Sequence, residues 1–271
     1  MPEPVSLPDA ASVDWVIRVP AAEPVAVNGV VSFDTAGTGP GSMLYPAPGA
    51  VGLLAAIVTH GIIESSVKRK QRIKMQEDAD QILLPYRATL ATLSNRDVEQ
   101  AALSRHPFGD RKKPDVSVAG ATPQWRINST PHFLLTQDQR AFIVDNAIDV
   151  YAPASDVPAY RTVVRVVSRP RDEQDLVTLW TADQGSELKK EWAYLFSESV
   201  EVALKTARSG AGEAFTTMRY MEGGSEKIER AQVLYRECGR AVLRTLRGTP
   251  MSVPVRQEAP ADSATGVCTA P

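Results

Sequence analysis

The feature that most constrains this chain is a run of 29 residues without a formal charge, from Thr35 to Ile63. Its potentially helical part, residues 46–63, is 18 residues long, close to the lower limit for spanning a hydrocarbon core about 30 Å thick. We expect a long Gly/Ala-rich helix over about 49–84, apolar in its first half and charged in its second. Five basic residues fall in the second half: Lys68, Arg69, Lys70, Arg72 and Lys74.

Two interpretations of this helix stay open. In one, the conservative interpretation, the apolar half packs on its own domain and the charged half is solvated. The five basic residues contact anionic lipid or an anionic ligand only in the other interpretation. In the other, the apolar half contacts a membrane or a second copy of the chain through close-packing small residues; the residues that we expect to do so are Gly52, Leu54, Ala56, Ile57, His60 and Gly61.

The stretch YPAPGAVGLLAAIVTHGIIESS, residues 45–66, precedes a charged helix and a compact α+β region. It resembles the glycine-zipper segments of bacterial cell-envelope proteins, many of them lipoproteins, over about 40 residues. The ladder of small residues is interrupted at His60, and the first residues show neither a signal pattern nor a cysteine for lipid attachment. The resemblance implies an envelope location and self-association, and implies no activity.

Strand patterns dominate the rest of the chain. Residues 12–33 hold two short valine-rich runs, and alternating or β-branched patterns recur later in the sequence. Because the later runs are separated by short connections, we expect neighbouring antiparallel strands. These later runs cover residues 132–136, 141–151, 159–168 and 175–181.

Two further helices are expected. In residues 186–207, Leu188, Trp192, Phe196 and Val200 recur on one helical face, and Trp180 and Trp192 are expected core residues. Residues 225–248 carry a weaker helical stripe, and a β-hairpin turning at Gly239 is the alternative for them.

These patterns predict an α+β fold: an antiparallel sheet of about four or more strands packed by helices, preceded by the long Gly/Ala-rich helix. The predicted organisation has four parts. They are an N-terminal extended or β segment with a Gly/Pro linker (1–48), a helical region (49–104), an α+β domain (125–250) and a disordered tail (251–271).

The sequence offers little catalytic chemistry. It contains no familiar catalytic or phosphate-binding motif, and its three histidines lack the spacing of metal ligands. We therefore expect no cofactor, no metal and no enzymatic activity. An enzyme whose site is assembled from distant residues stays open as an alternative, with Asp145 and Glu222 as natural candidates beside arginines. The net charge of −2 argues against nucleic-acid binding.

Charge and cysteine patterns leave two smaller questions. Arg219, Arg230, Arg240, Arg244 and Arg247 form either a solvated face or a site for an anionic ligand or lipid headgroup. The two cysteines, Cys238 and Cys268, are expected to be unpaired thiols; a disulfide between them that anchors the tail, which would require an oxidising compartment, is the alternative.

The sequence thus predicts a non-enzymatic bacterial envelope protein, periplasmic or membrane-associated. Its α+β domain would bind an unidentified protein partner, and its helix 49–84 would contact an anionic membrane surface or form a homo-oligomer. A cytoplasmic homo-oligomeric scaffold is the further alternative. The bacterial origin is inferred from the excess of arginine over lysine, 21 to 9.

Overall fold

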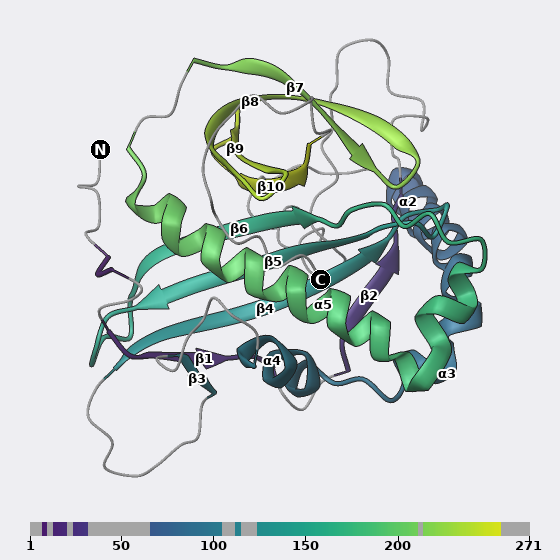
Figure 1. Cartoon of the computed structure of the whole chain (residues 1–271), viewed down its shortest axis with the longest axis horizontal. Coiled ribbons are helices and arrows are strands. Elements are labelled where there is room, and N and C mark those ends of the chain that lie inside the picture. Colours follow the sequence, from purple (N-terminus) through teal and green to yellow (C-terminus); the bar gives the residue numbers. More distant parts are fainter. Residues whose placement is uncertain are drawn as a thin grey trace.

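The computed structural model describes residues 7–9, 13–20, 24–31, 66–104, 112–114, 124–210 and 214–255, with the backbone alone for 66–69 and 112–114. Within these residues, a ten-stranded mixed sheet runs in the order β3-β1-β4-β5-β6-β10-β9-β8-β7, and β2 also pairs with β4. The long helix α5 lies across the central strands, and the C-terminal strands curl away beside it (Figure 1). The α+β class is confirmed.

Three long antiparallel strands form the centre of the sheet: β4 (Trp125–Leu135), β5 (Phe142–Tyr151) and β6 (Pro158–Val167). They confirm the first three of the later strand predictions. Short connections between them permit only this neighbouring antiparallel arrangement.

The prediction of an all-antiparallel sheet is wrong. The strands β1 (Trp15–Arg18) and β2 (Ala26–Gly29) both run parallel to β4. Strand β3 (Lys112–Pro114) runs parallel to β1, and strand β10 (Pro250–Pro254) runs parallel to β6. Parallel pairing needs a long connection, and the many residues between these paired strands provide it.

The helix predicted over residues 186–207 is confirmed, and the strand predicted at 175–181 is wrong. Helix α5 spans Leu176–Arg208, with a non-helical break at Ala182–Gly185. Asp175 caps its first turn by accepting a hydrogen bond from the Thr178 N–H at 3.0 Å. The run Leu176–Thr181 therefore begins a helix, although its β-branched residues suit a strand equally well.

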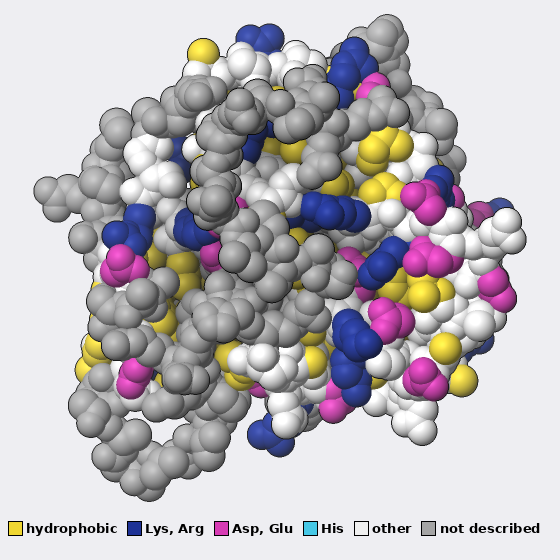
Figure 2. All heavy atoms as spheres, viewed as in Figure 1, with side chains coloured by type: hydrophobic (Ala, Val, Ile, Leu, Met, Phe, Trp, Pro, Cys, Tyr) yellow, Lys and Arg dark blue, Asp and Glu magenta, His cyan; other side chains and the backbone are white. Residues whose placement is uncertain are grey.

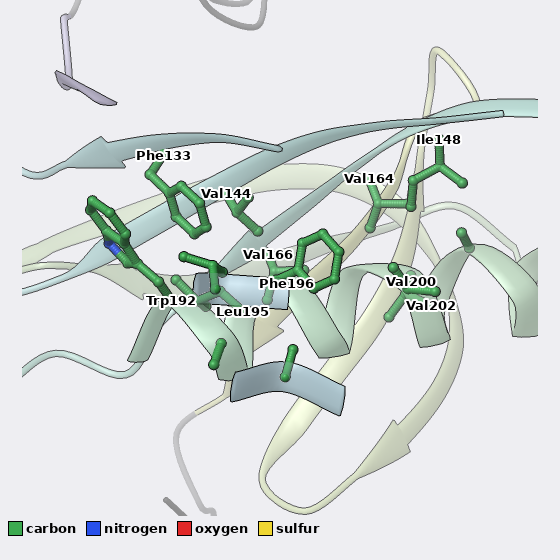
Figure 3. Close-up of a cluster of buried hydrophobic side chains, with 14 of the residues drawn as sticks. Phe133, Val144, Ile148, Val164, Val166, Trp192, Leu195, Phe196, Val200 and Val202 are labelled. Carbon is green, nitrogen blue, oxygen red and sulfur yellow. The ribbon is translucent and has the colours of Figure 1, made fainter. Parts of the chain in front are cut away.

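The main core lies between α5 and the central strands (Figure 3). The indole of Trp192 is fully buried and stacks on Phe133 of β4, with ring centroids 4.5 Å apart. Phe142 of β5 meets both Trp192 and Trp180 edge-on. The structure confirms that both tryptophans belong to the core.

The helix predicted over 225–248 is wrong, and the alternative hairpin is confirmed. The strands are β7 (Thr216–Glu222), β8 (Ser225–Glu237), β9 (Arg240–Thr245) and β10 (Pro250–Pro254). A register shift in β8 between Val233 and Tyr235 changes which face the following residues occupy, and so produces a spurious helical stripe.

Strand β10 also corrects the predicted tail, because residues 251–254 belong to the sheet. On the side away from α5, the curled strands enclose a second core. It joins Ile143 and Val167 of the central strands to residues of the C-terminal strands: Met218, Tyr220, Ala231, Ala241, Leu243, Met251 and Val253.

The N-terminal helical region is broken into short helices: α2 (Ser66–Ala79), the 3-10 helix η2 (Asp80–Tyr86), α3 (Arg87–Leu90) and α4 (Asn95–Leu103). Only the second half of the predicted 49–84 helix falls in the described residues, and there the α-helix ends at Ala79. Within the described part of the chain, no helix combines the length and hydropathy needed to cross a bilayer.

Candidate functional site

The predicted basic residues all lie on α2. Lys70 and Lys74 are exposed and one helical turn apart, with the exposed Ile73 between them. Arg72 is half-buried, and the side chains of Lys68 and Arg69 lie outside the described residues. The predicted membrane or self-association residues also lie outside the described residues: Gly52, Leu54, Ala56, Ile57, His60 and Gly61.

The C-terminal end of α2 is fastened to β2 by a compact hydrogen-bond network. The Asp80 carboxylate accepts the Gly29 N–H at 2.7 Å and the Asn28 side-chain amide at 2.8 Å. Gln76 donates to Asp80 at 2.8 Å and to the Gly29 carbonyl at 3.0 Å. A Cβ at Gly29 would lie 2.1 Å from the Ala79 carbonyl oxygen, so only glycine permits this approach.

A second group of polar residues forms a row across the central strands, on the face opposite α5. His132, Asp145 and Arg165 occupy directly opposed positions on β4, β5 and β6. Arg165 donates two hydrogen bonds to Asp145, Nε to Oδ1 at 2.7 Å and Nη2 to Oδ2 at 2.6 Å. Both side chains are largely buried, 17% and 2% exposed, so the pair is a desolvated, bidentate ion pair.

Glu222, the last residue of β7, joins this pair from the C-terminal strands. Burial raises the pKa of its carboxyl, and the charges of Arg165 and Lys227 oppose that rise. Lys227 Nζ lies 3.8 Å from Glu222 Oε1. The two carboxylates named from the sequence, Asp145 and Glu222, therefore act on the same guanidinium although 77 positions separate them.

His132 connects the ionic row to the network at α2. Its Nε2 lies 2.7 Å from Asn28 Oδ1, and Asn28 uses its amide nitrogen to donate to Asp80. This orientation of Asn28 makes His132 Nε2 the donor. Burial lowers the pKa of His132, against the raising effect of Asp145 and Asp80, so the imidazole is neutral at pH 7.

The tip of the β7–β8 hairpin is clamped to the turn between β4 and β5. Asp138 accepts hydrogen bonds from the Gly224 N–H at 2.5 Å and from the Thr136 hydroxyl at 2.6 Å. Burial alone raises the pKa of Asp138, but the hydrogen bonds from Thr136, Gly224 and Arg140 outweigh it and lower the pKa. The turn requires Gly223, which has a φ of +61°.

The arginines named from the sequence separate into different environments. Arg240 is buried and donates to the Ser252 hydroxyl and to the Val167 and Ser252 carbonyls. Arg244 donates to carbonyls at the C-terminal end of α5, while Arg219 and Arg230 remain exposed on the β7–β8 hairpin. They do not form a single anion site.

The prediction of two unpaired thiols is wrong, because Cys238 is disulfide-bonded. The sequence has one other cysteine, Cys268, which lies outside the described residues. No group of three or more potential metal ligands occurs among the described residues.

Sequence reasoning found Asp145 and Glu222 but missed Arg165, His132 and Asp138. For Arg165 and His132 the available signal was a polar side chain at an alternating position of an otherwise apolar strand, as in VVRVV and HFLL. Comparisons of the chain with protein-family models, curated proteins and solved structures give no significant match.

Proposed function

We propose that this chain is a non-enzymatic, envelope-associated binding protein that contacts an anionic membrane surface through residues 46–63 and α2. Its α+β domain would bind a protein partner. The observation that carries the proposal is the position of Lys70 and Lys74, both exposed on a helix whose far end is bonded to the folded domain.

The order of these segments supports membrane contact. The uncharged run ends at Ile63, and α2 begins at Ser66. An apolar segment in contact with the bilayer would leave the basic helix beside the headgroups. Each basic side chain near an anionic surface contributes roughly 1 kcal/mol, and lysines already ordered on a helix lose less entropy on binding.

The disulfide at Cys238 supports the envelope over the cytoplasm as the location. Disulfides persist in oxidising compartments such as the bacterial periplasm and are rare in the cytosol, where thiols are kept reduced.

The ionic row fits a structural role better than acid–base catalysis. A general acid or base must reach its substrate, yet the Asp145 side chain is 2% exposed and both of its oxygens accept hydrogen bonds from Arg165. Glu222 is likewise buried. The charge of Arg165 attracts Glu222 and so links β7 electrostatically to β6, which supports the sheet that would carry a partner.

The test is co-sedimentation with vesicles containing anionic phospholipid. The double variant Lys70→Glu/Lys74→Glu should bind at least about ten-fold more weakly than wild type. The control Arg87→Glu/Arg96→Glu makes the same change of net charge at exposed positions of α3 and α4 and should bind like wild type. Equal weakening in both variants would show general electrostatics and would contradict the assignment to α2.

A further inference from the structure

Three exposed large apolar side chains lie on or next to strands β7, β8 and β9. Ile228 in β8 is 59% exposed, Leu246 just after β9 is 57% exposed, and Phe215 just before β7 is 38% exposed. Apolar side chains that gather on one surface, unlike scattered ones, indicate a binding surface.

Strand register places these residues on one three-stranded segment. Thr216, Ala231 and Thr245 form one row across β7, β8 and β9. Phe215 lies one position before Thr216, and Leu246 lies one position after Thr245. Ile228 lies three positions before Ala231 in β8. All three are on or next to the same three-stranded segment.

The outward face of the hairpin also carries arginines. Arg219 lies directly opposite Ile228 in the register, and both are exposed while their neighbours Met218, Tyr220 and Glu229 are buried. Arg230, two positions from Ile228, points to the same face by strand alternation and is exposed. Arg219 binds Glu226 at 2.7 Å, yet its side chain remains 61% exposed.

We propose that this hairpin patch, formed by Phe215, Arg219, Ile228, Arg230 and Leu246, is a second contact with an anionic lipid surface. The apolar side chains enter the boundary between headgroups and acyl chains, and the arginines bind lipid phosphates. On this face Arg219 and Arg230 stand against one acidic side chain, Glu226, which pairs with Arg219. The remaining positive charge, on Arg230, complements the anionic lipid. The inference rests on the membrane contact proposed above and names a separate surface for it.

The tip of the β7–β8 hairpin and α2 are joined through the turn between β4 and β5. Gln137 donates to the carbonyl of Ala79, the last residue of α2, at 3.3 Å. Asp138, the next residue, binds Gly224 at the hairpin tip. Figure 1 shows α2 and this tip at the same end of the molecule. In the space-filling view, a few basic and hydrophobic side chains and an acidic one reach the surface at the upper edge, among residues of other types (Figure 2). The hairpin tip and α2 are therefore both held to the same turn.

The experiment measures the affinity of the full chain for vesicles of phosphatidylglycerol and phosphatidylcholine. The test variant is Ile228→Ser/Arg230→Gln. The matched control is Val157→Ser/Arg87→Gln, which removes an apolar side chain that is 73% exposed and an exposed arginine elsewhere. Near-ultraviolet circular dichroism checks that both variants keep the wild-type fold.

The test variant should bind at least about five-fold more weakly than wild type, since one arginine near an anionic surface alone accounts for that factor, and the control should bind as wild type does. Wild-type affinity in the test variant, with binding still lost in Lys70→Glu/Lys74→Glu, would overturn the hairpin contact and leave the α2 contact standing. Absence of binding by the wild-type chain would overturn both. If vesicle affinity is unchanged but the test variant alters the oligomeric state, the patch joins copies of the chain and the lipid contact is wrong.

Discussion

Asp145 and Arg165 face each other across β5 and β6 and form a two-point ion pair in a largely buried position. Charges in such a setting have lost most of their hydration, so each depends on the other. The pair also contributes to the attachment of β7, because Arg165 attracts Glu222.

Removing one member of this pair should therefore be more damaging than removing both. We expect Asp145→Leu to lower the free energy of unfolding by about 3 kcal/mol, because it leaves Arg165 buried without its partner. The double variant Asp145→Leu/Arg165→Met should recover most of that loss. Urea unfolding of wild type, Asp145→Leu, Arg165→Met and the double variant measures both effects, and strictly additive losses would contradict the coupling.

Glu222 should make stability depend on pH with a predictable sign. Because its pKa is raised in the fold above the ordinary value of 4.5, its favourable contribution is fully present below about pH 4.5 and is lost as pH rises through the raised pKa. Glu222→Gln is neutral at every pH and lacks this loss. Its stability relative to wild type should increase as pH rises from about 4.5 and then level off. The groups acting on Glu222 are Arg165, Lys227, Asp145 and Asp138.

Chemical denaturation of both proteins at a series of pH values checks this prediction. The readout is the difference between the two unfolding free energies, since other titrating groups contribute equally to both proteins. A difference that stays constant from pH 4 to neutrality would show that Glu222 is not perturbed by the fold.

The attachment of the β7–β8 hairpin tip to Asp138 can be tested by comparing alanine substitutions at two glycines. Gly223→Ala places a Cβ 2.5 Å from Asp138 Oδ1 at a φ of +61°, whereas Gly248 has a φ of +83° with nothing within 4 Å of an added Cβ. Both variants carry the strain of a left-handed backbone, roughly 1–2 kcal/mol. Gly223→Ala should be the more destabilising in thermal melts. Equal losses would mean that Asp138 moves aside freely.

The core assignment predicts a large effect at Trp192. Trp192→Ala removes a fully buried ring stacked on Phe133 and should lower stability by on the order of 3 kcal/mol or more. Val157→Ala, at an exposed position between β5 and β6, is the control and should change the melting temperature little. An unchanged melting temperature for Trp192→Ala would contradict the packing of α5 on β4.

Local pattern was sufficient for the central strands and for α5 from Ser186 onward, because alternation and helical period are strong in long elements. It failed at 225–248, where the shift between Val233 and Tyr235 changes the face on which residues lie. It also failed to give the parallel pairing of β1 and β2 with β4, because sequence pattern carries no information on which distant strand a short strand joins.

The candidate site was accessible from the sequence only in part. Asp145 and Glu222 were predicted from the sequence as candidate carboxylates beside arginines. That both act on Arg165 depends on how the C-terminal strands curl over β5 and β6. Lys70 and Lys74 were identified from charge alone. Their attachment to the domain was not, because it depends on Gly29 and Asp80, which local sequence does not relate to each other.

The most direct test of the central claim is flotation of the full chain with anionic liposomes, comparing wild type with Leu54→Asp/Ile57→Asp. We predict that wild type floats with the liposomes, and that the variant stays at the bottom of the gradient while its circular dichroism and melting temperature match wild type. If neither protein floats and the variant unfolds, residues 51–63 belong to the core of the fold, and membrane contact through this segment is wrong.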